Sequence, residues 1–478
     1  MQKIISTLLF CLFTMCSTSC QSNESVPWQG FKHEYAYSLR ENNAAILDRR
    51  HIKPRDKLFF IEKKERQWKV TQTIEHLQKI LGDYLLADVI HNEEWLCIRT
   101  DYRYDTTYKA RIFLFQRRNG QWEYVDFIEG KTVYFDHAEI TDDNILYFSE
   151  NLLKFGMGVY AYDLNQTPPK LIHVIKPPRQ DGGDGFGRSF HVYDDTLFVT
   201  DTGAVYSKEE EKRYKITLGD RIIHVDDNGR HYMPPVWKWT VVAYRWTGNE
   251  WKYECDFYDL LPHPKDNGLR KDKKSLNGST ERYYYPLIRF DADNRPNVVN
   301  GQLYLTASDQ FYVFERDEND QWKFKERFNP PKLRKYEPHP GEIVFYNDCA
   351  PVRFGEKYSI AARDDSTFDI VKTDRIKEWQ PLWNTFYGSE ELHAAEITER
   401  VNNAEYLGVG RSGDIVSNTA LFFYNSRESF EPAHSLRKQK VWGGISIFEI
   451  DDQEGPKEVF RMETNDDSGL HVVDMKQQ

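Results

Sequence analysis

The chain has 478 residues, of which 40% are hydrophobic, 29% are charged and 15% are aromatic. This composition is that of a soluble, folded protein and excludes a disordered one, and the length exceeds one ordinary core unless the fold is a repeat or a closed ring. The net charge of -11 argues against nucleic acid as the main partner, because phosphate binding needs a basic face.

The first residues predict an export signal over residues 1–19. Lys3 supplies a short positive start, and residues 4–15 form a mostly apolar run. This run has the length of a signal-peptide core and is too short to cross a bilayer as a helix. We therefore expect an exported protein, and we leave this segment out of the fold.

The end of this signal resembles the lipobox of bacterial lipoproteins. Small residues precede Cys20, which in that family carries the lipid after cleavage, but Ser17 stands where a leucine is usual. The alternative is an ordinary secretory signal cleaved near Ser19. Gln21 after the cysteine resembles an outer-membrane address, and polar residues within 20–33 predict a flexible tether. The resemblance implies a protein anchored to the outer membrane by lipid.

An aromatic-rich strand, a polar turn and a tryptophan strand recur along the chain. The clearest copies lie at residues 58–70, 112–127, 241–253 and 311–328. Residues alternate around turns such as Asn119-Gly120, which is the signature of a β-hairpin. Each copy therefore predicts two paired strands.

A second unit, of two shorter apolar strands, precedes each of these copies. Its first strands begin near residues 87, 137, 190, 297, 352 and 395, with a faded copy near 44–47. Two hairpins make a four-stranded antiparallel sheet, and a closed ring of such sheets buries both faces of each. We predict an all-β fold, a single β-propeller over residues 34–478. Seven blades are expected, and eight are the alternative because the interval from 190 to 297 is double.

Three insertions interrupt the repeat, at about residues 207–235, 263–281 and 329–341. They are rich in charge, in glycine and asparagine, and in proline respectively. Such stretches predict exposed loops, and long loops on one rim of a propeller are where binding usually occurs. We expect a monomer that holds a protein or glycan partner on this rim.

Residues 183–206 resemble the FG-GAP repeat of integrin α propellers and bacterial surface proteins. The resemblance rests on Gly185-Phe-Gly-Arg-Ser189 and on Gly203-Ala-Val-Tyr206. It implies a binding scaffold, often with a calcium loop, because hard cations need several oxygen ligands from one tight turn. Asp291, Asp293 and Asn294 are the candidate calcium ligands, but Arg295-Pro296 follows where the loop needs glycine. We therefore predict no cofactor and keep calcium as the alternative.

Histidines near the starts of first strands are the candidate catalytic residues. His137 and Glu139 have an echo at 393–396, and His191 occupies a comparable place in its own unit. Together with Arg188, such residues could provide a base and a charge neutraliser. No motif supplies a nucleophile with its base, so we expect a non-catalytic scaffold. The alternative is a propeller-fold polysaccharide lyase or glycoside hydrolase.

Three scattered cysteines, Cys97, Cys255 and Cys349, remain after Cys20. They cannot form a disulfide framework, and none belongs to a CxxC pair. We expect buried free thiols, with one disulfide as the alternative.

Overall fold

The computed structural model describes most of the chain from Tyr35 onward. The described residues are 35–48, 57–75, 77–82, 84–101, 109–132, 135–150, 158–178, 185–205, 224–225, 231–232, 237–262, 273–274, 280–281, 290, 296–307, 310–328, 352–362, 368–375, 377, 413–429, 439–453, 455–465 and 469–473. The predicted signal at 1–19 and the tether at 20–33 lie outside them, so both stay predictions.

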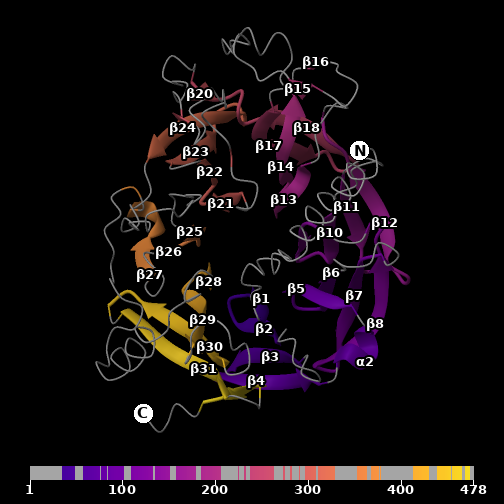
Figure 1. Cartoon of the computed structure of the whole chain (residues 1–478), viewed down its shortest axis with the longest axis vertical. Coiled ribbons are helices and arrows are strands. Elements are labelled where there is room, and N and C mark those ends of the chain that lie inside the picture. The colour runs from indigo at the N-terminus through magenta and orange to yellow at the C-terminus, as the bar shows by residue number, and fades with distance from the viewer. Residues whose placement is uncertain are drawn as a thin grey trace, which may run out of the picture.

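Within these residues, seven antiparallel sheets of three to five strands are arranged in a ring (Figure 1). We number them as blades in chain order. Blade 1 contains β1 (Tyr35–Leu39), β2 (Asn43–Asp48), β3 (Lys57–Lys64) and β4 (Gln67–Ile74). Blade 2 contains β5 (Leu85–His91), β6 (Trp95–Asp101), β7 (Arg111–Arg118) and β8 (Gln121–Glu129). Blade 3 contains β9 (Ala138–Ile140), β10 (Ile145–Glu150), β11 (Gly158–Asp163) and β12 (Lys170–Ile175).

The second half of the ring is less regular. Blade 4 contains β13 (Phe186–Tyr193), β14 (Thr196–Val205), β17 (Trp237–Trp246) and β18 (Trp251–Asp256). Blade 5 contains β21 (Asn297–Val299), β22 (Gln302–Ala307), β23 (Gln310–Arg316) and β24 (Trp322–Phe328). Blade 6 contains β25 (Val352–Phe354), β26 (Tyr358–Ala362) and β27 (Phe368–Lys372). Blade 7 contains β28 (Gly413–Val416), β29 (Thr419–Ser429), β30 (Gln439–Asp451), β31 (Gly455–Asn465) and β32 (Gly469–Val472).

Helices are few and short in the described chain. Helix α2 (Leu77–Leu81) places Leu77 and Leu81 in the core between blades 1 and 2, and η2 (Thr373–Arg375) follows β27. None of the described helices is long and apolar enough to cross a membrane. The all-β prediction is therefore confirmed.

The hairpins form where the sequence predicts them. Asn119 and Gly120 join β7 to β8, and both have positive φ, at 50° and 79°. Two consecutive residues of this kind make the turn that matches the twist of paired strands. The equivalent turn of blade 1 consists of Glu65 and Arg66, also with positive φ, although neither is a residue type that favours it. Strand pairing overrides local preference there.

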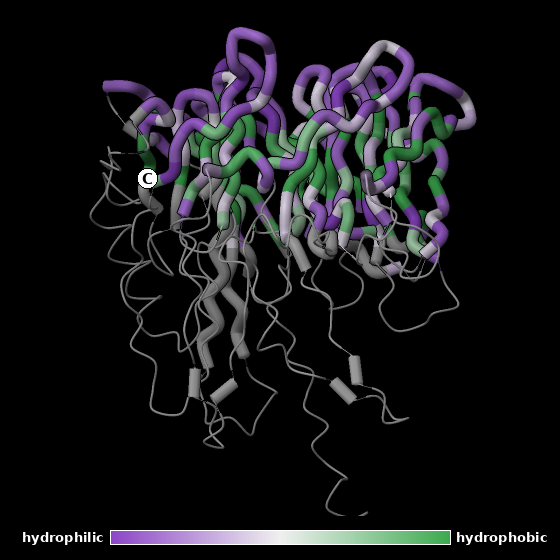
Figure 2. Tube along the Cα trace, turned by 90° about the horizontal axis from the view of Figure 1, so that it is seen from above, coloured by the Kyte–Doolittle hydropathy of each residue, from purple (hydrophilic) through white to green (hydrophobic). Residues whose placement is uncertain are grey.

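The core consists of seven clusters of buried apolar residues, one at each seam between neighbouring blades of the described chain. Strand β7 illustrates the reason, because residues 112–115, Ile-Phe-Leu-Phe, are all buried. Two of its side chains face blade 1 and two face blade 3. A sheet buried on both faces needs a neighbour on each side, and the ring provides it. Figure 2 shows the apolar residues along the strands and polar residues in the turns.

In the described chain the ring is closed by side-chain contacts and not by strand pairing. Blade 1 and blade 7 are each built from one continuous run of strands, and no strand of one pairs with the other. Instead Phe59, Ile61 and Trp68 of blade 1 pack against Ile447 and Phe460 of blade 7. The first and last sheets lie side by side in Figure 1.

The two rims of the ring differ. The connections from the first to the second strand and from the third to the fourth are short turns, such as Asp194-Asp195 and Asn119-Gly120, and they share one rim. We call it the short-turn rim. Strands β14 and β24 end at the opposite rim, directly before the predicted insertions 207–235 and 329–341.

The insertions themselves lie largely outside the described residues, and so their extent stays a prediction. Inside 207–235 only the ladder of β15 (His224–Val225) with β16 (His231–Tyr232) is described. Inside 263–281 only the ladder of β19 (Lys273–Lys274) with β20 (Thr280–Glu281) is described. Since the described residues within 190–297 contribute one four-stranded sheet and these two small ladders, the blade count of the described chain favours seven over eight.

The first described strand of blade 7 lies later in the chain than the strand that the sequence pattern predicts. We expected its first strand near residue 395, but the first strand of the last sheet is Gly413–Val416. The predicted pair at 395–397 and 406–409 lies outside the described residues. Ile415 and Leu421 supply the buried apolar pattern of a first hairpin, around a turn at Ser417 with φ 56°. Gly413–Val416 has two apolar residues, the same number as 395–397, so the apolar count alone did not separate the two.

Cys97 and Cys255 are free thiols, as predicted, whereas Cys349 lies outside the described residues. Burial raises the pKa of both thiols above its ordinary range, with nearby acids adding to the effect at Cys255. Both side chains are therefore protonated and serve as small apolar residues of the core.

Gly187 shows why the best-preserved repeat has a glycine at this position. It has a φ of 82° inside β13, at an irregular point of the pairing with β14, and a Cβ there would lie 3.0 Å from Cβ of Ser149 in blade 3. We expect Gly187→Ala to lower the free energy of unfolding by about 2 kcal/mol, from backbone strain plus this contact.

Gly120→Ala is the matched control, because Gly120 has a φ of 79° and the methyl group of an alanine there would have no other atom within 4 Å. We expect about 1 kcal/mol for Gly120→Ala in urea unfolding; equal losses would show that the interblade contact contributes nothing.

Candidate functional site

A histidine and a glutamate from neighbouring blades form a hydrogen bond near the axis of the ring. His191 lies on β13 and Glu139 on β9, which are the innermost strands of blades 4 and 3. Nδ1 of His191 is 2.9 Å from Oε1 of Glu139, and the side chains are only 15% and 14% exposed. The second oxygen of Glu139 accepts the backbone N–H of Val192 at 3.3 Å. The carboxylate thus fixes the ring of His191 and one edge of β13.

His137 lies beside this pair in a packing role. Its ring meets the ring of Phe190 edge to face, with centroids 4.7 Å apart. Its backbone N–H donates to Oγ of Ser149 at 3.2 Å, and its carbonyl accepts the N–H of Ser149 at 3.0 Å. Arg188 is exposed on the same strand as His191. Of the residues singled out in the sequence, the structure brings Glu139 and His191 together.

The other candidate residues lie outside the described chain. These are the calcium candidates Asp291, Asp293 and Asn294, the lipidation site Cys20, and the echo at 393–396. Among the described residues, no group of three or more histidines, cysteines or acids could hold a metal ion. Calcium binding and lipidation therefore stay predictions.

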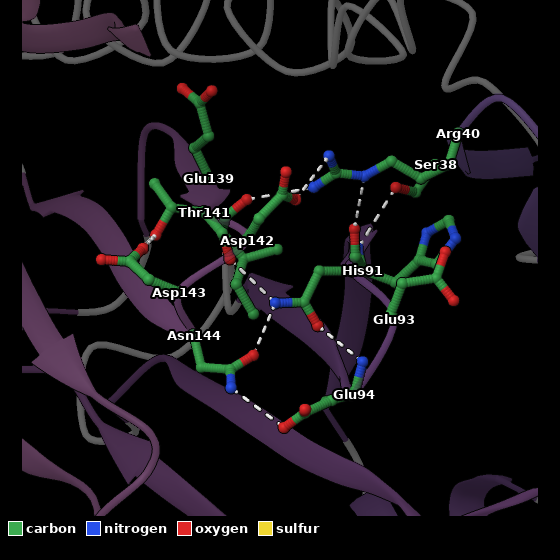
Figure 3. A network of polar contacts seen from close by, with 12 residues as sticks. Ser38, Arg40, His91, Glu93, Glu94, Glu139, Thr141, Asp142, Asp143 and Asn144 are labelled. Atoms are coloured by element: carbon green, nitrogen blue, oxygen red, sulfur yellow. Dashed lines mark hydrogen bonds and ion pairs between the residues drawn. The ribbon is translucent and has the colours of Figure 1, made fainter. Parts of the chain in front are cut away.

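Arg40 ties three blades together at the short-turn rim. It directly follows β1, and its Nε donates to the carbonyl of His91 in blade 2 at 3.0 Å. Its Nη2 donates to the carbonyl of Ile140 in blade 3 at 3.1 Å, and its Nη1 pairs with Asp142 at 3.2 Å. Figure 3 shows the guanidinium reaching across to Asp142 and to the backbone of His91. A planar guanidinium with five N–H donors can donate to two carbonyls and a carboxylate at once, which the single ammonium group of a lysine could not do in this geometry.

Two buried asparagines form the centre of the same network. Asn92 and Asn144 are 3% and 8% exposed, and Nδ2 of Asn92 donates to Oδ1 of Asn144 at 2.8 Å. Nδ2 of Asn144 donates to Glu94 at 3.0 Å and to Asn165 at 2.8 Å. Asn144 has a φ of 65°, a left-handed conformation that asparagine tolerates. The turns of blades 2 and 3 are thereby joined side chain to side chain (Figure 3).

Sequence reasoning did not identify Arg40, Asn92 or Asn144. A signal was present, since each lies in or beside the turn after a first strand, where Asp and Asn are expected to cap backbone groups. The chemistry of the site follows from these contacts. Its donors and acceptors are directed at neighbouring blades, so the arrangement holds the short-turn rim rigid.

His91 makes this network sensitive to pH. Its pKa falls from 6.5 to about 3, because burial disfavours the imidazolium, and because cationic Arg40 and Arg117 lie nearby. Nε2 of His91 hydrogen-bonds Oδ1 of Asn43, whose amide donates to Glu93 at 2.9 Å. Because that oxygen accepts, Nε2 carries the proton, and the lowered pKa keeps the ring neutral at pH 7.

Stability should therefore fall with acid. The folded state holds His91 neutral while the unfolded state takes up a proton below pH 6.5, so stability is complete above that pH and is lost as the pH falls toward 3. Between pH 6.5 and 4.5 we expect a loss of about 2–3 kcal/mol from this group, measured by urea unfolding. His91→Gln has no titrating group at this position. The difference in free energy of unfolding between this variant and the wild type should therefore shrink as the pH falls. A difference that stays constant with pH would contradict the assignment of this pH dependence to His91.

The ring of sheets defines the class of this protein: it is a β-propeller with seven blades in the described chain. The sequence matches no protein-family model and no curated protein. Solved structures similar to it include a periplasmic gluconolactonase of Pseudomonas aeruginosa, at 12% identity over 91% of this chain and 99% of that one, with a TM-score of 0.41.

Two further solved structures share a similar level of likeness. The β-propeller domain of the Trilobed protease from Pyrococcus furiosus has 9% identity over 91% of this chain and 98% of that one, with a TM-score of 0.41. Hsv2 of Kluyveromyces lactis has 9% identity over 89% of this chain and 97% of that one, with a TM-score of 0.40. These likenesses concern the fold alone.

Proposed function

We propose that this protein is a non-catalytic scaffold of the bacterial cell envelope that holds a protein or glycan partner. The observation that carries the proposal is the set of polar contacts that join blades 1 to 4 along their innermost strands and first turns. Arg40 donates to two backbone carbonyls, and His191 is paired with Glu139 at 2.9 Å. Polar groups used in this way stabilise a rigid frame, and rigid frames with variable loops suit binding.

The anchor and the repeat type belong to the same proposal. Cys20 carries the lipid, the chain is exported to the outer membrane, and residues 20–33 tether the propeller to it. The propeller is of the FG-GAP type, with Phe186 and Gly187 at the start of β13. The partner lies on the rim where β14 and β24 end, opposite the short-turn rim, and the net charge of -11 disfavours nucleic acid there.

The binding proposal is tested by isolating the intact protein from its native membrane together with its partner, and by probing it on a glycan array. We expect one protein or one glycan class to be retained, and retention to survive His191→Ala. A protein that retains neither, yet turns over an acidic polysaccharide, would overturn the scaffold function.

The anchor is tested separately. Cys20→Ala should abolish labelling by a radioactive fatty acid and release the protein from the membrane fraction. Cys97→Ala is the control, since Cys97 is buried and should not be labelled. Labelling that persists in Cys20→Ala would contradict the lipobox assignment.

A polysaccharide lyase or glycoside hydrolase is the second candidate, favoured by the His191–Glu139 pair. A carboxylate on Nδ1 orients an imidazole so that its other nitrogen can exchange a proton with a substrate. In that case His191→Ala and Glu139→Gln both abolish turnover of an acidic polysaccharide, while Tyr124→Ala on the outer strand β8 leaves it unchanged. Equal turnover in all three variants would remove the enzymatic alternative.

A further inference from the structure

A cation and a tryptophan face each other in the outer hairpin of several blades. Strand register places the cation near the end of the third strand and the tryptophan at the start of the fourth. The pairs are Lys63 with Trp68 in blade 1, Arg117 with Trp122 in blade 2, and Arg316 with Trp322 in blade 5. These positions are equivalent copies within the repeat.

Each of these cations forms an ion pair with an acid of the preceding blade. Lys63 pairs with Glu449 at 2.8 Å, Arg316 pairs with Glu254 at 2.7 Å, and Arg117 pairs with Glu62. Arg117 and Arg316 also lie over the rings of their tryptophans, 5.8 and 4.6 Å from the centroids. At each of these three seams, an ion pair therefore joins the outer parts of the two neighbouring blades.

Blade 4 departs from this pattern. Strand register places Trp246, not a cation, opposite Trp251. The ring of Trp246 meets His173 of blade 3 at 4.8 Å and Trp251 at 5.5 Å, between centroids. An aromatic contact replaces the ion pair at the seam between blades 3 and 4.

The aromatic surface continues outward from there. Tyr253 lies two residues after Trp251, and so on the same face of β18, and it is 47% exposed. Its ring contacts Tyr244, with centroids 6.0 Å apart. Trp246, Trp251 and His173 are half-buried. We call His173, Trp246, Trp251 and Tyr253 the blade 3–4 aromatic strip.

The strip is uncharged and small. Burial lowers the pKa of His173, so its ring is neutral at pH 7, and the neighbouring Lys252 pairs with Glu250 at 3.2 Å. Partly exposed rings of this size offer on the order of 100 Å² each, or about 400 Å² for the four together, which is about half of the roughly 800 Å² per partner of a stable protein interface. A neutral ligand with apolar faces and polar edges fits such a surface better than a folded protein does.

We propose that the blade 3–4 aromatic strip binds a neutral saccharide. The apolar C–H faces of pyranose rings pack on Tyr253 and the tryptophans, while the sugar hydroxyls reach the phenol of Tyr253, the ring nitrogens of His173 and water. This inference rests on the proposed binding function and takes glycan as the ligand class. It adds a second site, because the strip adjoins the turn between β17 and β18 at the short-turn rim, opposite the rim where β14 and β24 end. Saccharide binding would also explain why blade 4 has Trp246 where other blades have a cation. A cation at this position would pair with an acid of blade 3, and the ion pair would cover the aromatic rings.

The test uses the full-length protein in detergent, with maltohexaose, cellohexaose and laminarihexaose as neutral probes and hexagalacturonate as the charged one. Isothermal titration calorimetry should detect binding of at least one neutral probe, with the charged probe at least tenfold weaker. Tyr253→Ala should weaken that binding at least tenfold, and so should Trp246→Lys, which introduces the residue type of blade 1.

Tyr124→Ala is the matched control, because Tyr124 occupies the equivalent place in blade 2, is 40% exposed, and adjoins the closed seam. It should bind like the wild type, and thermal melting should show that Tyr253→Ala remains folded. Failure of all neutral probes to bind, or equal affinity of Tyr253→Ala and Tyr124→Ala, overturns the proposal. If no neutral probe binds while the wild type still retains the partner isolated from the membrane, only the strip fails and the scaffold function stands.

Discussion

Trp68→Ala is expected to lower the free energy of unfolding by about 3–5 kcal/mol, as for other large buried aromatic residues. Trp68 is 5% exposed and lies in the cluster that joins blade 1 to blade 7. Its Nε1 donates to Glu449 of blade 7 at 2.8 Å, and the same carboxylate pairs with Lys63. Because no described strand is shared between these blades, this cluster is what closes the ring.

Urea unfolding followed by near-ultraviolet circular dichroism measures the loss. Hydrogen exchange should show faster opening of both β4 and β31, since the cluster stabilises the two sheets together. Tyr124→Ala, at a side chain that is 40% exposed on β8, should cost less than about 1 kcal/mol. A loss below about 1 kcal/mol for Trp68→Ala would mean that closure does not depend on this packing.

Much of the fold follows from the sequence because its hairpins are local. Asn119-Gly120 specifies its turn without help from distant residues, and the alternation on either side specifies which side chains face each neighbour. The seven-blade ring follows in turn, since each sheet needs a partner on both faces. The strand Gly413–Val416 of blade 7 escaped prediction because it and the predicted strand at 395–397 each carry two apolar residues, which a short-strand pattern does not distinguish.

The candidate site was predictable only in part. Glu139 and His191 were both assigned to first strands of consecutive units, and consecutive first strands are neighbours in a ring, so their meeting follows from the repeat. Arg40 contacts residues 51 and 100 positions later in the chain, in two different blades. Such contacts depend on side-chain reach and on the radius of the ring, which no local pattern encodes.

The departures from the repeat became visible only after strand register was known. In the sequence, Trp246 appears as one aromatic residue among many in a tryptophan-rich hairpin. Register with Trp251 shows that it occupies the place of Lys63, Arg117 and Arg316. A repeat makes positions comparable, so a substitution at one copy points to a local role there.

Asn92→Ala is expected to lower the free energy of unfolding by about 3–4 kcal/mol, although it removes only a small polar side chain. Oδ1 of Asn92 accepts the backbone N–H groups of Glu94 and Trp95 at 2.9 and 2.7 Å. Its Nδ2 donates to the carbonyl of Thr141 and to Oδ1 of Asn144, both at 2.8 Å. At 3% exposure, water cannot replace these four hydrogen bonds, so alanine leaves buried groups unsatisfied.

Asn165→Ala is the matched control, because Asn165 belongs to the same network but is exposed, and it should cost less than about 1 kcal/mol. Asn92→Asp distinguishes the contribution of the acceptor Oδ1 from that of the donor Nδ2. It keeps both acceptor bonds but directs a carboxylate at the carbonyl of Thr141, close to Glu94, which raises the pKa of the new acid. Its deficit relative to the wild type should therefore shrink as the pH falls, while that of Asn92→Ala stays constant; equal pH dependence in both variants would show that the donor bonds to blade 3 contribute little to the rigidity of the short-turn rim.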